Sequence, residues 1–307
     1  MNTYVVKAGD TLAKIADQFG VDVKALAQVN AIKDPNKIAV GKSLVIPNLT
    51  TDLQDLAVEA NVAHEPVIDR TTFRLPTTEF ANETSAKDLI MLHFTASSSA
   101  QSVFNAWMAP VNGKPYRVAT AYVVDVDGRI YEFFPPEKWA WHLGMTGNNP
   151  NSINDRRAVA IEIVNVGGLQ EDPVNKDQLN WWPNNYKTRW CAKSEKDRYV
   201  KATYRGINYF AAFPGIQVTA VHDLVHHLAA KFNIPKVLPP AAKRTEFDPV
   251  FFSAYKGIAS HQNYRPDKTD MGPAWNWSSL GISSALGRKP VPGRPPRPSP
   301  KKSPPRH

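Results

Sequence analysis

The chain has 307 residues, of which 42% are hydrophobic and 21% are charged, as in an ordinary soluble protein. No apolar run approaches the length needed to cross a bilayer, so we expect no membrane span. The net charge of +9 invites a nucleic-acid interpretation, but residues 287–307 hold seven lysines or arginines and no acid, which leaves the rest near +2. The first residues lack a basic segment followed by an apolar one, so we expect no secretory signal.

Residues 1–48 predict a small strand–helix–helix–strand module. Tyr4 begins a β-prone stretch, and Asp10 is the expected N-cap of a helix whose apolar residues recur at helical spacing until Gly20. The segments YVVKAGDTLAKIADQFGVDVKALAQVNAI and GKSLVIP resemble a LysM domain over its whole length. The resemblance implies binding to glycans that contain N-acetylglucosamine, chiefly peptidoglycan or chitin.

Two segments carry little that predicts a fold. Residues 49–87 are polar, and we interpret them as a linker with a short helix near 53–62. Residues 287–307 are rich in proline and basic residues, and we expect a disordered tail because they offer no apolar core. The single cysteine, Cys191, excludes an internal disulfide, and we expect it to be inert.

The segment 88–286 is predicted to be a mixed sheet flanked by helices, an α/β (α+β) domain that holds the chemistry. Residues 88–95 form a buried-type strand that ends near a histidine, and residues 119–132 predict a hairpin that turns at Asp-Gly. Residues 139–144 (WAWHLG) form an aromatic loop, and residues 158–164 are an apolar strand interrupted by one carboxylate. Residues 260–273 form a polar loop that contains KTD.

Five side chains in these segments suggest a catalytic zinc site. Two imidazoles and one carboxylate suit Zn²⁺ with a fourth position open to water, and His93, His261 and Asp270 supply that set if the strand end and the loop converge. A general base is also needed, and Glu162 stands alone in its hydrophobic strand. Lys268 is the expected cation for the oxyanion.

This ordered series resembles the N-acetylmuramoyl-L-alanine amidase type 2 family, whose fold peptidoglycan-recognition proteins share. The resemblance covers most of residues 88–276, with a larger insertion than usual near 168–200. It implies that His93, His261 and Asp270 bind zinc, and that Glu162 and the Lys268 of KTD serve catalysis.

The resemblance also implies further cleft residues. In some members a hairpin tyrosine takes the role of the base, so Tyr122 is a second candidate. The AWHLG segment is similar to the family's AWHAG, which makes His142 a substrate-cleft residue rather than a metal ligand; Trp141 and Thr95 are placed in the same cleft. Members often have a second histidine where this chain has Phe94.

Structural alternatives exist for several of these residues. Glu162 could pair with Arg156 or Arg157, and Lys268 could simply be solvated. His222 and His226 have a metal-like spacing, but they lack the HExxH glutamate and lie in an apolar helical pattern, so we interpret them as surface or structural residues.

The combined interpretation is a zinc amidase that cleaves between N-acetylmuramic acid and L-alanine, tethered by LysM and acting on peptidoglycan in the periplasm or cell wall. Without a signal peptide, export by another route or release by lysis is expected, as for a phage-type lysin or an antibacterial effector with a delivery or immunity partner. A non-catalytic peptidoglycan-binding protein is the main alternative, and a nucleic-acid binder using the basic tail is a third.

Overall fold

The computed structural model describes residues 2–19, 26–27, 30, 32, 34, 37–46, 63–144 and 152–282. The chain folds into two compact units, Met1–Val62 and Ala63–His307. None of the described helices is both long and apolar enough to cross a membrane. The helix predicted near 53–62 and the basic tail lie outside the described residues.

The described residues of the first unit include two paired strands and the helix α1. Strand β1 (Asn2–Val5) runs antiparallel to β2 (Ser43–Ile46), and α1 spans Leu12–Phe19. The expected cap differs by one residue, because Lys14 donates its backbone N–H to the Thr11 hydroxyl, whereas Asp10 accepts from the Tyr4 hydroxyl. The core of this unit is a cluster of aliphatic side chains: Val6, Leu12, Ile15, Ala16, Leu26, Ala27, Leu44 and Ile46.

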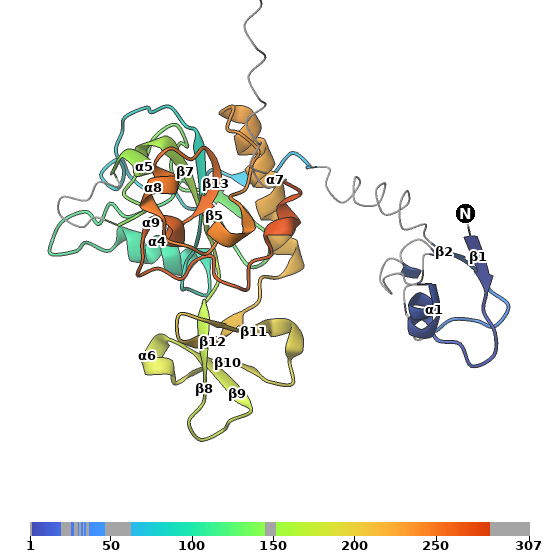
Figure 1. The fold of residues 1–307 in the computed structure, drawn as a ribbon. Helices are drawn as coiled ribbons and strands as arrows, with labels where there is room; N and C mark the ends of the chain where they lie inside the picture. Colours follow the sequence, from blue (N-terminus) through green and yellow to red (C-terminus); the bar gives the residue numbers. More distant parts are fainter. Residues whose placement is uncertain are drawn as a thin grey trace, which may run out of the picture. The chain divides into compact units, whose positions relative to one another are not determined.

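The second unit is built on a six-stranded mixed sheet, which confirms the predicted fold class (Figure 1). The strand order is β13-β4-β7-β5-β6-β3, and every neighbouring pair is parallel except the β5–β6 hairpin. The strands are β3 (Ile68–Asp69), β4 (Leu89–Phe94), β5 (Tyr122–Val124), β6 (Ile130–Glu132), β7 (Ala158–Ile163) and β13 (Gly257–Ser260).

Apolar side chains cover both faces of this sheet. On one face Ile90 and Leu92 join a large cluster with residues of α7 (Gly215–Lys231), and on the other Leu89 and Met91 pack with Phe252. Buried strands of this kind read as continuous hydrophobic runs. The helical segments of the unit are α4 (Ala100–Met108), α5 (Ser152–Arg157), α7 (Gly215–Lys231), η2 (Ala241–Lys243), α8 (Pro249–Ser253), α9 (His261–Tyr264) and η3 (Trp277–Leu280).

Residues 63–87 belong to this unit, so the predicted linker is too long at its C-terminal end. β3 joins the edge of the sheet beside β6, and both Leu75 and Phe80 are buried in its main cluster. The polar composition of the segment hid these few anchoring residues.

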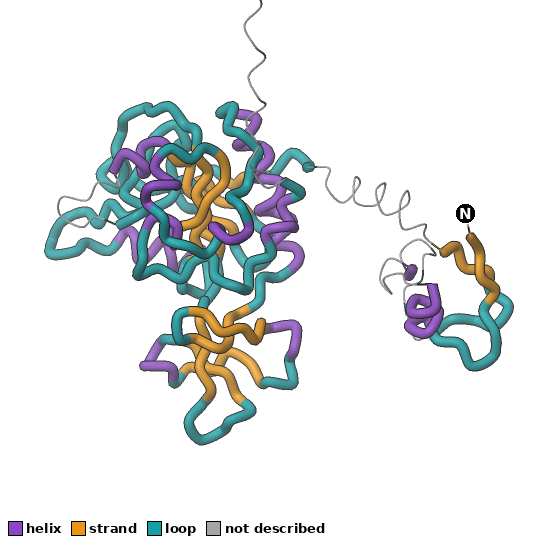
Figure 2. The backbone as a smooth tube through the Cα atoms, viewed as in Figure 1, coloured by secondary structure: helices purple, strands orange, loops and turns teal. Residues whose placement is uncertain are grey.

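A second, five-stranded antiparallel sheet is inserted between β7 and α7 (Figure 2). Its order is β10-β9-β8-β12-β11, and it has a small core of its own in which Cys191 is buried. The insertion expected near 168–200 therefore extends to residue 211. Its elements are β8 (Gly168–Glu171), β9 (Gln178–Trp181), α6 (Pro183–Tyr186), β10 (Thr188–Ala192), η1 (Lys196–Arg198), β11 (Tyr199–Tyr204) and β12 (Ile207–Ala211).

Candidate metal centre

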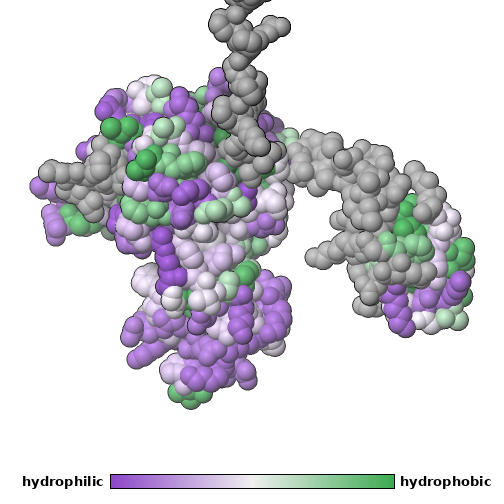
Figure 3. Space-filling model, viewed as in Figure 1, coloured by the Kyte–Doolittle hydropathy of each residue, from purple (hydrophilic) through white to green (hydrophobic). Residues whose placement is uncertain are grey.

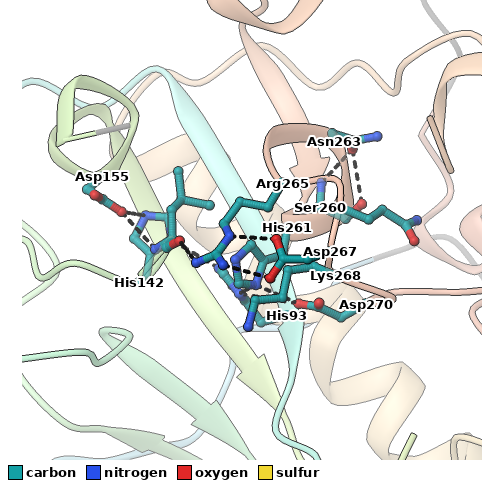
Figure 4. A network of polar contacts seen from close by, with 12 residues as sticks. His93, His142, Asp155, Ser260, His261, Asn263, Arg265, Asp267, Lys268 and Asp270 are labelled. Carbon is teal, nitrogen blue, oxygen red and sulfur yellow. Dashed lines mark hydrogen bonds and ion pairs between the residues drawn. The ribbon is translucent and has the colours of Figure 1, made fainter. Parts of the chain in front are cut away.

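Three buried side chains converge where neighbouring strands end (Figure 4). His93 is near the end of β4, and His261 follows β13, the strand that pairs with β4. The Nδ1 atoms of His93 and His261 are 3.0 Å apart, and Asp270 Oδ2 lies 3.1 Å from His261 Nδ1 and 3.4 Å from His93 Nδ1. The structure thus brings together the three residues predicted as ligands.

The spacing of these atoms fits a tetrahedral zinc ion. Zinc–nitrogen bonds of about 2.0–2.1 Å separate neighbouring ligand atoms by about 3.3 Å, close to the distances observed. Burial, and then the His261 charge, lowers the pKa of His93 to about 4. Burial would raise the pKa of Asp270, but the two imidazoles lower it below its usual range. Neutral imidazoles and an ionised carboxylate are the forms that bind a metal.

Protein contacts hold the loop that carries Asp270. Gln262 donates its backbone N–H to the Asp270 carbonyl over 3.0 Å, and Arg265 forms a bidentate pair with Asp267 at 2.7 and 2.9 Å. From the inserted sheet, the Arg205 guanidinium donates to the carbonyls of Pro266 and Lys268. The loop is therefore fixed from two sides.

Glu162 lies beside His93 because the two residues are direct neighbours in the β4–β7 register. Its Oε2 atom is buried and has no hydrogen-bond partner among the described residues. Burial, reinforced by the Asp270 charge and opposed by Lys268, raises the pKa of Glu162 well above its usual value. A raised pKa makes a carboxylate a stronger base than an exposed one.

The ion pair proposed as a structural alternative for Glu162 is not formed. Arg157 pairs with Asp88 at 2.6 Å, and Arg156 pairs with Glu83. The Lys268 side chain is partly exposed, and its charge acts on both Glu162 and His93.

Tyr122 is not brought to this cluster. In the β5–β7 register Val123 is the neighbour of Glu162, so Tyr122 projects from the opposite face of the sheet. Its hydroxyl donates to Glu132 Oε2 over 3.1 Å. The structure does not support the alternative assignment of the base to Tyr122.

His142 lies behind the cluster and is buried. Its Nδ1 is 3.0 Å from His93 Nε2, and its Nε2 is 3.5 Å from Asp155 Oδ1, which also accepts the Leu143 N–H over 2.9 Å. This places His142 where it can orient a ligand rather than in an open cleft. Asp155 was missed in the sequence, where nothing distinguishes it from other polar residues of its helix.

The other two predicted cleft residues lie in different surroundings. Thr95 lines a cavity together with Glu162, whereas the ring of Trp141 packs against the Arg117 guanidinium, 4.2 Å from its centroid. His226 lies on α7 and binds the Leu280 carbonyl at 2.8 Å through Nε2, and His222 contacts Asp223.

Two imidazoles and a carboxylate, with a partnerless buried carboxyl oxygen beside them in the described part of the chain, are the groups that metal-dependent hydrolases use. A LysM domain model matches residues 4–47, and a model of N-acetylmuramoyl-L-alanine amidase matches residues 83–273. The latter covers more than half of the chain, which therefore belongs to the N-acetylmuramoyl-L-alanine amidase family.

Individual relatives match over short stretches. The amidase XlyA of Bacillus subtilis (strain 168) is 57% identical over 44 residues, which are 14% of this chain and 15% of XlyA. The endolysin of Bacillus phage B103 is 50% identical over 44 residues, 14% of this chain and 17% of the endolysin. The chain thus spans only a small part of these relatives.

Solved structures of similar fold cover more of the chain. The amidase AmiD from E. coli is 20% identical with a TM-score of 0.39, covering 72% of this chain and 68% of AmiD. AmpDh3 from Pseudomonas aeruginosa is 18% identical with a TM-score of 0.38, covering 71% of this chain and 67% of AmpDh3.

Proposed function

We propose that this protein is a zinc-dependent peptidoglycan amidase that hydrolyses the amide between the lactyl group of N-acetylmuramic acid and L-alanine. The observation that supports the proposal most strongly is the approach of His93, His261 and Asp270 to within 3.4 Å of one another beside Glu162. The LysM module would hold the enzyme on the wall glycan.

His93, His261 and Asp270 would hold the ion, which when bound supplies a Lewis acid that polarises the amide carbonyl and activates water. Glu162 accepts a proton from the attacking water and returns it to the departing amine, a role that suits its raised pKa. Lys268 faces the negative charge that develops on the carbonyl oxygen.

The test is mass analysis of purified sacculi digested by the full chain with zinc. Free stem peptides that begin with L-alanine are expected, and glycan fragments that keep their peptides would contradict the proposal. Binding of the zinc-loaded protein to sacculi without any release of peptide would instead identify a non-catalytic peptidoglycan-binding protein.

Two variants assign the roles within the site. Glu162→Ala should retain zinc and lose about 10²- to 10⁴-fold in activity, because it removes only the proton carrier. His93→Ala should lose both the metal and the activity. Full lysis by Glu162→Ala would move the role of the base to another group.

We further propose that the enzyme acts at the cell wall, either as a lysin or as an antibacterial effector. A glycan-binding module is of little use for an enzyme that acts only on small soluble fragments, whereas on an insoluble polymer it raises the local concentration of the catalyst.

A further inference from the structure

A cavity of about 360 Å³ adjoins the buried carboxylate of Glu162. One wall is the loop after β4, which includes Thr95 and Ser97, and another is α4. The third wall is formed by Trp181 and Trp182 of the inserted sheet. Its volume is at the lower end of the range for small-ligand sites.

The inserted sheet is tied to the loop that follows the metal-ligand strand. The indole N–H of Trp182 donates to the Ala96 carbonyl over 2.6 Å, three residues after His93. Even so, Trp182 is 52% exposed, and its ring centroid is 6.1 Å from that of Trp181 in an edge-on arrangement. An indole that is fixed at its N–H and exposed on its face can act as a binding platform.

The chemistry of the lining suits an uncharged, hydroxylated ligand. Among the described residues, Glu162 is the one charged side chain of the lining, and the hydroxyl groups of the wall belong to Thr95, Ser97, Ser98 and Ser102. A stem peptide carries carboxylates that need cations, and neither Lys268 nor Arg205 lines this cavity. The apolar face of a pyranose ring matches an indole, and its hydroxyls match those of the lining.

The surface of the inserted sheet also argues against a protein partner. The face of this sheet seen in Figure 3 is mainly hydrophilic and lacks the kind of contiguous apolar patch that marks many protein-binding sites. Trp182 instead lies at the cavity that Glu162 also lines.

We propose that the inserted sheet builds a glycan subsite in which Trp182 stacks on a pyranose ring of the peptidoglycan strand, on the sugar side of the scissile amide. The inference rests on the proposed amidase function and adds the direction in which the substrate lies across the site. The sugar occupies the cavity of Trp182, and the peptide lies toward Lys268. The inserted sheet then makes the enzyme selective for substrates that carry glycan.

Residue-specific oxidation tests occupancy directly. The full chain is exposed to hydroxyl radicals with and without stem-free peptidoglycan glycan oligomers, and oxidation is measured by peptide mass spectrometry. Oxidation of Trp182 should fall about threefold or more, while that of Phe247, 40% exposed outside this cavity, should not change. Because the readout is local, glycan bound by the LysM module does not affect it.

Kinetics test selectivity with two soluble substrates, N-acetylmuramyl-tetrapeptide and the same peptide carrying only D-lactate. Trp182→Ala should raise KM for the sugar-bearing substrate about tenfold more than for the sugar-free one. The control Val174→Ala, at a site 92% exposed in the loop between β8 and β9, should leave that ratio unchanged.

Unchanged Trp182 oxidation, or protection by free stem peptide instead of glycan, would overturn the subsite even if sacculi are digested. If stem-free glycan protects Trp182 but digestion of sacculi releases no stem peptide, the amidase proposal is overturned and the subsite stands.

Discussion

Asp155 should control zinc affinity although it is not a ligand. Its Oδ1 lies 3.5 Å from His142 Nε2, and His142 Nδ1 lies 3.0 Å from the Nε2 atom of His93. Partners of this kind fix the ring orientation of a metal-bound histidine, and their loss typically costs about 10- to 100-fold in metal affinity. We therefore expect Asp155→Ala to weaken zinc binding by about 1.4–2.8 kcal/mol.

The measurement is competition with a chromophoric chelator, using metal-free protein whose folding is checked by circular dichroism. The Leu143 N–H also loses its acceptor in Asp155→Ala. Asp155→Asn is the matched variant, because it keeps an oxygen for Leu143 but offers His142 a partner that stays uncharged above about pH 7, where Asp155 ionises. It should lose less affinity than Asp155→Ala. Native zinc affinity in a folded Asp155→Ala variant would refute the reasoning.

Four further predictions address stability, the catalytic loop and the wall-binding module. Burial raises the pKa of Asp155 to about 7. Between about pH 4 and 7 the folded state therefore holds a proton that the unfolded state releases, so the free energy of unfolding falls as pH rises. Asp155→Asn lacks this titration. In urea unfolding of metal-free protein, its free energy of unfolding relative to that of the unchanged protein should rise by up to about 4 kcal/mol across this range. Lys87 donates to three main-chain carbonyls at 2.8–3.0 Å, so Lys87→Met should lower the free energy of unfolding by at least about 3 kcal/mol, and an unchanged urea midpoint would contradict this. Arg205→Ala releases the loop of Lys268, and kcat should fall about tenfold with zinc content unchanged; equal loss of zinc would mean that the contact supports the ligands instead. Deleting residues 1–48 should weaken sacculus pull-down more than hydrolysis of a soluble muropeptide, and equal losses would argue against a tethering role.

The strands near the metal centre could be predicted because their apolar runs are long and end at polar residues. β4 and β7 lie within a residue of their expected bounds, and the hairpin turns at Asp127-Gly128 as its sequence indicates. Which side chains share a face was harder to predict. Tyr122 lies in a run that is buried on both sides, so alternation could not show that it points away from Glu162.

Features that depend on contacts between distant segments could not be predicted. Asp155 acquires its environment only when its helix packs behind the loop of His142, and Arg205 finds its acceptors more than 60 residues away along the chain. The same holds for Leu75 and Phe80, two core residues in a segment whose composition resembles a linker. The ligand set was accessible because family resemblance supplied long-range information that spacing alone lacks.

The inserted sheet links substrate recognition to the geometry of the metal centre. Trp182 binds the loop that follows His93, and Arg205 binds the loop that carries Lys268. Both contacts come from one sheet with its own core, so the two loops are fixed relative to each other during folding. The entropy of ordering them is then lost before ligands bind, which favours a preorganised site. A glycan bound at Trp182 would contact the same inserted sheet that holds the loop of Lys268 through Arg205.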